Sequence, residues 1–145
     1  MRYNKPADES NLFTLDQRLA GDTLRLGTLS LCEVLRFDDR RYDWLIVVPR
    51  VAGAVEFLDL DAAQQVQLAR EIQQVSQALK NWRPAAKLNV AALGNVVAQL
   101  HVHLVLRDEG DAAWPGPVWG HSPAQRFAGA EAAEQCHIWQ QRLNL

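Results

Sequence analysis

The sequence predicts one α+β domain, in which helices pack on an antiparallel sheet. A length of 145 residues fits a single domain, and an apolar content of 48% is sufficient to form a core. The expected elements follow the order strand pair, long helix, strand pair, helix, and the short turns within each pair favour antiparallel pairing. We therefore assign residues 1–145 to one domain, with a loose polar segment at 1–10 and a terminal helix at 128–145.

The first part of the chain predicts a short helix and then a strand pair. Residues 11–23, NLFTLDQRLAGDT, indicate a helix that ends near Gly21. Residues 24–37 alternate partially between leucine and polar residues, which indicates one strand with a bend or bulge near Gly27. After the polar turn DDRRYD at 38–43, the run WLIVVPR at 44–50 predicts a second strand, closed by Pro49.

Residues 57–82 predict the clearest helix of the chain. Asp61 and Gln64 form the pattern of a capping box, and Pro84 ends the helix soon after Trp82. Four apolar side chains recur at helical spacing on one face: Leu68, Ile72, Val75 and Leu79. A buried apolar stripe facing a sheet follows from this pattern.

The remaining elements are two strands, a loop and a helix. KLNVAAL at 87–93 predicts a third strand, the Gly-Asn pair at 94–95 a turn, and VVAQLHVHLVLR at 96–107 a fourth strand. AWPGPVWG at 113–120 indicates a rigid loop. The helix at 128–145 places Ala132, Cys136 and Trp139 toward one side.

Charge and composition exclude several classes of function. The net charge is −2 and there is no basic run, so nucleic acid is not an expected partner. No apolar run reaches the roughly 18 residues that a membrane span needs, and the N-terminus lacks a secretory pattern. Cys32 and Cys136 belong to no CxxC pair, so we expect reduced thiols and a cytoplasmic location.

The segment QLHVHLVLR at 99–107 carries the pattern that points to chemistry. Successive side chains of a strand point to opposite faces, so Gln99, His101 and His103 share one face. Neighbouring histidines discourage each other's protonation, and a neutral imidazole is a good base or nucleophile near pH 7. Three interpretations compete: a solvated sheet face, a metal site, and a nucleophilic histidine acting on an acyl or phosphoryl centre.

A metal site needs more ligands than this strand supplies. A closed site takes about four ligands. The others would have to come from distant carboxylates or from a set without local clustering: Cys32, His121, Cys136 and His137. We therefore predict neither a metal nor another cofactor.

GNVVAQLHVHLVLR at 94–107 resembles the signature strand of the histidine triad (HIT) superfamily, in which three histidines alternate with apolar residues. His101 falls on the second triad position, His103 on the third and Gln99 on the first. The preceding VVPR, FLDLD and KLNV segments and the later AAWPGPVWG segment agree with the family's order of elements. The resemblance spans most of residues 12–127 and is nearest to a bacterial group with glutamine first.

The resemblance implies an α+β meander, commonly a homodimer, that binds a nucleotide such as a purine nucleoside phosphate on its sheet. Its members hydrolyse or transfer nucleotides from phosphoramidates, nucleotidyl adducts or dinucleoside polyphosphates. By the resemblance, His101 attacks the α-phosphorus and forms a nucleotidyl-histidine, while His103 hydrogen-bonds phosphate oxygens. A further group would bind the nucleotide and its phosphate: Phe37, Asn89, Gly94, Asn95 and Trp114.

Other residues leave alternatives open. Trp114 and Trp119 either cover the pocket or anchor the loop, and Phe37 either stacks on the base or packs in the core. Arg107 pairs either with a phosphate or with Asp108 or Asp111.

Two positions depart from the family pattern. Gln99 cannot titrate, so it positions His101 or the phosphate by hydrogen bonds, and Val96 replaces a small hydroxyl residue. The alternative function is therefore a nucleotide-binding or regulatory module that has lost turnover.

Overall fold

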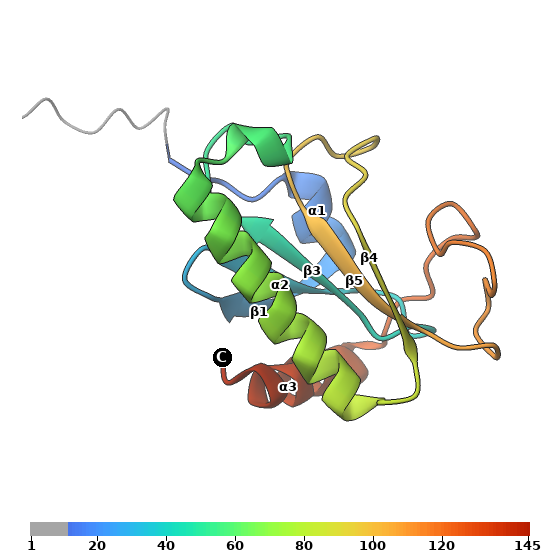
Figure 1. Cartoon of the computed structure of the whole chain (residues 1–145). Helices are drawn as coiled ribbons and strands as arrows, with labels where there is room; N and C mark the ends of the chain where they lie inside the picture. The colour runs from blue at the N-terminus through green and yellow to red at the C-terminus, as the bar shows by residue number, and fades with distance from the viewer. Residues whose placement is uncertain (1–11) are drawn as a thin grey trace, which may run out of the picture.

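The computed structural model describes residues 12–145, so the expected loose segment at 1–10 lies outside the described residues. It confirms the α+β class: a five-stranded antiparallel sheet in the order β1-β2-β3-β5-β4, with helices packed on it (Figure 1). The elements are α1 (Gln17–Asp22), β1 (Thr23–Thr28), β2 (Cys32–Phe37), β3 (Trp44–Pro49), η2 (Phe57–Asp59), α2 (Ala62–Trp82), β4 (Lys87–Ala91), β5 (Val102–Arg107) and α3 (Gly129–Leu143).

The single strand predicted for 24–37 is wrong, because these residues form the hairpin of β1 and β2. The Leu29 N–H donates to the Cys32 carbonyl at 2.8 Å and closes the turn. The buried Glu71 carboxylate of α2 accepts the N–H groups of Leu31 and Cys32 at 2.7 and 2.8 Å. A side chain 39 and 40 residues away thus satisfies two N–H groups of the turn. The predicted bulge is present, since the pairing shifts between Arg25 and Gly27.

The strand predicted for 96–107 is shorter than expected. β5 begins at Val102, because Leu100 N–H donates to the carbonyl of Ala54 at 3.0 Å rather than to a neighbouring strand. The predicted alternation nevertheless persists through the segment. Leu100, Val102 and Leu104 belong to the core beneath the helices, whereas His101 and His103 lie on the other face.

The helices α2 and α3 cover one face of the sheet, and α2 crosses in front of it in Figure 1. The predicted capping box is present: Asp61 accepts from Gln64 N–H at 2.8 Å, and Gln64 Oε1 accepts from Asp61 N–H at 2.9 Å. The predicted face is present too, with Leu68, Val75 and Leu79 buried. In residues 12–145 no helix has the length and apolarity to span a membrane.

The opposite face of the sheet is packed by α1 and by the segment that follows β5. Its core is built around Trp44, Ile46 and Val105, which alternate with the side chains that face α2. Leu19 of α1 and Val118 of the later segment complete this second core. The histidine face therefore looks into a space walled by α1 and by the segment at 118–124.

Candidate nucleotide site

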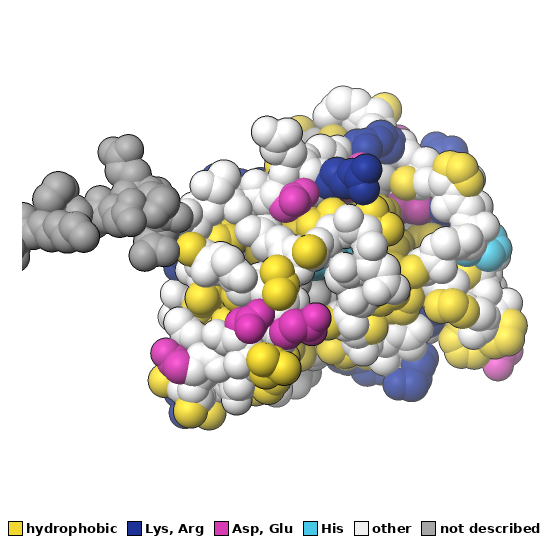
Figure 2. Space-filling view, turned by 90° about the horizontal axis from the view of Figure 1, so that it is seen from above, with side chains coloured by type: hydrophobic (Ala, Val, Ile, Leu, Met, Phe, Trp, Pro, Cys, Tyr) yellow, Lys and Arg dark blue, Asp and Glu magenta, His cyan; other side chains and the backbone are white. Residues whose placement is uncertain are grey.

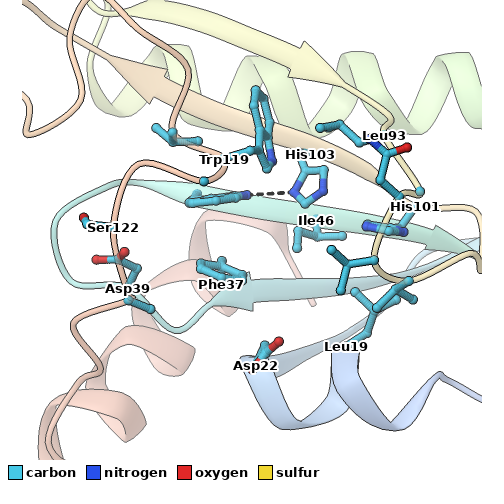
Figure 3. A pocket seen from close by; sticks show the side chains of 18 residues that line it. Leu19, Asp22, Phe37, Asp39, Ile46, Leu93, His101, His103, Trp119 and Ser122 are labelled. Carbon is cyan, nitrogen blue, oxygen red and sulfur yellow. Dashed lines mark hydrogen bonds between the residues drawn. The ribbon is translucent and has the colours of Figure 1, made fainter.

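An open pocket of about 290 Å³ lies on the histidine face of the sheet. Its walls come from α1, β2, β3, the loop at 93–97 and the segment at 118–124 (Figure 3). Seen from above in Figure 2, a small area of histidine surface lies recessed among hydrophobic side chains. Both histidines of the QLHVHLVLR segment line this pocket.

The ring of His101 is oriented by a hydrogen bond between its Nδ1 and the backbone two residues earlier. Its Nδ1 lies 2.6 Å from the carbonyl oxygen of Gln99, and the side chain is buried. Because a carbonyl oxygen only accepts, Nδ1 carries the proton. In the neutral ring, Nε2 then keeps its lone pair. His101 thus offers an unprotonated nitrogen, as a nucleophile requires.

His103 is held in the opposite tautomer. The indole Nε1–H of Trp44 donates to its Nδ1 at 3.0 Å, shown dashed in Figure 3. Since an indole N–H only donates, Nδ1 is the acceptor, and the proton of the neutral ring sits on Nε2. Burial, and secondarily the charge on nearby His101, lowers the pKa of His103 to about 3. His103 is therefore a neutral hydrogen-bond donor at physiological pH, and the ring centre of His101 lies 4.8 Å from its own.

Aromatic packing fixes the Trp44 indole that sets this tautomer. Phe37 stacks on it with ring centres 4.1 Å apart, and Trp119 meets it edge-on at 6.0 Å. Trp119 also packs edge-on against His103 at 5.3 Å. Phe37 lines the pocket and also packs on the second core, so its predicted core packing is present, whereas stacking on a base stays a prediction.

The loop at 93–97 forms the rim beside the histidines. Gly94 has φ +74°, a conformation that glycine adopts without strain. The backbone N–H groups of residues 94–97 make no hydrogen bond to any other group of residues 12–145. Such groups are suited to bind a phosphate oxygen. Gly94 and Asn95 line the pocket together with Leu93, Val96 and Val97, and their contact with a phosphate stays a prediction.

The far end of the pocket is acidic. Asp22 and Asp39 line it together with Ser122. Burial raises the pKa of Asp39, but hydrogen bonds from the Arg41 side chain and backbone outweigh that effect and hold the pKa below its ordinary value. Asp39 is therefore ionised and already paired, at 2.8 Å from Arg41 Nη2.

The structure does not bring Gln99 into the pocket. Its Oε1 accepts from the Asp16 N–H at 2.8 Å, and its Nε2 donates to the Thr14 carbonyl at 2.8 Å. The amide therefore clamps the segment before α1, while its own backbone carbonyl holds His101. The amide was expected to position His101 or the phosphate, but in the structure it binds the backbone of Thr14 and Asp16.

Asn89 and Trp114 also lie outside the pocket. Arg107, fully buried, donates to Asn89 Oδ1 at 3.0 Å, to both carboxylate oxygens of Asp111 at 2.7 and 3.1 Å, and to the Gly116 carbonyl at 2.7 Å. Trp114 packs near the Arg107 guanidinium with its ring centre 5.8 Å away. Arg107 thus anchors the loop, which is the second of its two predicted roles, with Asp111 as the partner. Of the two tryptophans, Trp119 lines the pocket.

Sequence reasoning missed several of the lining residues: Leu19, Asp22, Asp39, Trp44, Ile46 and Ser122. Only the sheet register reveals part of this set, because Ile46 pairs directly opposite His103. Period-two alternation then puts Trp44 on the same face. Among the described residues, no group of three or more His, Cys, Asp or Glu side chains is placed to hold a metal ion.

The chain is similar to histidine triad proteins in both sequence and structure. Residues 19–110 match the model of the HIT domain family. A histidine triad protein from Bradyrhizobium japonicum is 45% identical, with 91% of this chain and 98% of that chain covered and a TM-score of 0.85. One from Marinobacter aquaeolei is 42% identical, with 92% and 97% covered and a TM-score of 0.88. Diadenosine triphosphate hydrolase from Plasmodium falciparum shares the fold at 12% identity, with 99% and 90% covered and a TM-score of 0.59. No curated protein sequence matches the chain.

Proposed function

Because this chain belongs to the HIT domain family, we propose that it binds a nucleotide and hydrolyses or transfers the nucleotidyl group through His101. The observation that carries the proposal is the pair of opposite tautomers. His101 presents a nitrogen lone pair and His103 presents an N–H, side by side in one pocket. A nucleophile and an oxygen-binding donor are the two groups that attack at phosphorus requires.

The reaction then proceeds in two displacements. His101 Nε2 attacks the α-phosphorus, a phosphorus–nitrogen bond forms, and the leaving group departs with the electron pair of the broken bond and a proton from solvent. Water, or another acceptor in a transfer, attacks the same phosphorus and releases His101. His103 Nε2–H and the backbone N–H groups of the 94–97 loop stabilise the charge on the phosphoryl oxygens.

The test is turnover on three substrates: an adenosine phosphoramidate, an adenylated amine and a diadenosine polyphosphate. We expect release of adenosine monophosphate by the wild type and none by His101→Ala. His137→Ala is the matched control, because His137 is exposed on α3 and lies outside the pocket. Trapping of a ³²P-labelled nucleotidyl-protein that disappears in His101→Ala identifies the intermediate. Turnover that persists in His101→Ala contradicts the proposal.

One observation favours the alternative, a nucleotide-binding module without turnover. Gln99 occupies the first triad position, and both ends of its amide are bound to the backbone of Thr14 and Asp16. No titratable group therefore stands at that position to exchange protons. Binding of adenosine monophosphate, measured by calorimetry, together with no product from any of the three substrates would establish this alternative.

Two further features belong to the proposal. β4 is an edge strand with Val90 exposed, which suits pairing with a second copy in a homodimer. Cys32 and Cys136 are free thiols, which suits a reducing location such as the cytoplasm. Light scattering and fractionation test these two points.

A further inference from the structure

A second pocket lies between α2 and α3, on the side of the sheet opposite the histidines (Figure 1). Its volume is about 290 Å³, at the lower end of the roughly 300–1,000 Å³ that small-molecule pockets enclose. The second half of α2 forms one wall, and the last turn of α3 forms the other. None of the residues that line the histidine-face pocket lines this one.

The side chains that line this second pocket are mostly amides, and none of them is a carboxylate. Five amide side chains share the walls with one guanidinium: Gln73, Gln74, Gln77, Asn81 and Asn144 with Arg142. Two of the amides order each other, because Gln77 Nε2 donates to Asn81 Oδ1 at 2.8 Å. That bond leaves the Nδ2 group of Asn81 available as a donor. The lining therefore offers several N–H groups and one positive charge.

Arg142 is held by aromatic stacking rather than by an ion pair. Its guanidinium carbon lies 3.6 Å from the centre of the Trp82 ring and 5.0 Å from that of Trp139. Within residues 12–145 its N–H groups bind neither a carboxylate nor another acceptor. Stacking uses the face of the guanidinium plane and leaves the N–H groups at its edge for a ligand. A fixed guanidinium with free N–H groups matches paired oxygens of a carboxylate or a phosphate.

The two helical segments around Arg142 contain no acidic residue. Asp and Glu are absent from residues 72–82 and 135–145, although the whole chain has 17 of them against 15 Lys and Arg. The last turn of α3 is capped, since the Asn144 N–H donates to the Gln141 carbonyl at 3.3 Å. An anion beside Arg142 therefore gains an opposite charge and meets no carboxylate in the lining.

We propose that this pocket is a second ligand site, which binds a small anion through the Arg142 guanidinium and the surrounding amides. The ligand class is a compound with a carboxylate or phosphate group, since both present oxygens that a guanidinium binds in pairs. The α2 amides of the pocket are exposed and have to be ordered on binding, so we expect a dissociation constant on the order of 1 mM. Binding at this site does not involve His101.

Site-resolved NMR of the full chain tests the proposal. We would titrate ¹⁵N-labelled protein with inorganic phosphate and, separately, with malonate, at an ionic strength held constant with sodium chloride. Saturable chemical-shift changes should appear at the Arg142 Nε–H and at the side-chain amides of Gln77 and Asn81. Tighter binding of phosphate identifies a phosphoryl ligand, and tighter binding of malonate identifies a carboxylate. No saturable change at these groups with either compound overturns the proposal.

One variant on each wall tests the role of charge in the pocket. Arg142→Gln removes the guanidinium, and Gln77→Glu places a carboxylate in the pocket. Gln77 is exposed on α2, so Gln77→Glu keeps the test decisive even where loss of the Trp82 stack disturbs the fold of Arg142→Gln. We expect each change to weaken binding by about tenfold or more. Unweakened binding in Gln77→Glu, or in a folded Arg142→Gln, would overturn the proposal.

Two matched controls separate the pocket from the general charge of the helices. Arg70→Gln removes an exposed arginine from α2, and Gln141→Glu adds a carboxylate to an exposed position of α3. Neither residue lines the pocket, so binding should weaken far less than in the pocket variants. An equal loss in the controls would attribute the effect to net charge and overturn the site. The N–H groups of residues 94–97 report anion binding at the histidine face separately, so the result does not depend on the proposed function.

Discussion

Protonation of His103 should destabilise the fold as the pH falls below neutrality. Its pKa is about 3 in the folded protein, against an ordinary value of 6.5 that describes the unfolded chain. The unfolded state thus binds more protons between these values, so acidification favours unfolding in that window. The free energy of unfolding should therefore be about 2 kcal/mol lower at pH 5 than at pH 7.5. The loss begins below pH 6.5 and grows until about pH 3.

The assay is urea unfolding at pH 7.5, 6.5, 5.5 and 5.0, followed by tryptophan fluorescence. A loss of about 2 kcal/mol corresponds to a fall of roughly 1 M in the urea midpoint, for a slope of about 2 kcal/mol/M. The control is His103→Asn, whose Oδ1 can still accept from the Trp44 indole but cannot titrate. The substitution itself changes the stability by an amount that does not depend on pH, and this amount cancels when each protein at pH 5 is compared with the same protein at pH 7.5. If both proteins lose equal stability between pH 7.5 and pH 5, the buried neutral His103 is not the cause.

Three further substitutions probe named contacts. Trp44→Phe removes the hydrogen-bond donor to His103 but keeps an aromatic ring stacked on Phe37. We expect kcat/KM to fall about tenfold while circular dichroism shows a folded protein. Unchanged turnover would show that the indole does not set the tautomer of His103. Gln99→Leu removes two hydrogen bonds to the segment before α1 and should lower the free energy of unfolding in urea by about 1–3 kcal/mol. An unshifted urea midpoint would contradict this expectation. Glu71→Leu leaves two N–H groups of the β1–β2 turn unpaired and should lower the free energy of unfolding, measured by calorimetry, by about 2–4 kcal/mol. Gln67→Leu on the same helix is the milder control, because it removes only the hydrogen bond that Gln67 donates to Glu71.

The parts of the fold that sequence predicted are those encoded by local pattern. The capping box of α2, its apolar face and the alternation around His101 depend on residues a few positions apart, and all three are confirmed. The β1–β2 turn was missed because the group that satisfies it is the Glu71 carboxylate, which follows far along the chain. Within the turn itself, Ser30 is only a weak local signal.

The site residues that could be predicted from the sequence are likewise those placed by a local pattern. Side-chain alternation was sufficient to place His101 and His103 on one face. It was insufficient for Gln99, because the partners of its amide are 83 and 85 residues away. Trp44 and Asp39 enter the pocket through strand register and through the ion pair with Arg41, neither of which leaves a periodic signal in the sequence.

The pocket joins α1 to the segment at 118–124, which follows about a hundred residues later, and this separation has a consequence for its formation during synthesis. Gln99 holds Thr14 and Asp16, Arg41 holds Ser122 across 81 residues, and Arg126 reaches back 104 residues to Asp22. Because a ribosome delivers the chain from its N-terminus, α1 and β1–β3 emerge well before the side chains that close the pocket over them. A chain released before residue 118 therefore retains both histidines yet lacks Trp119 and Ser122. The pocket is therefore complete only after residues 118–124 have been synthesised.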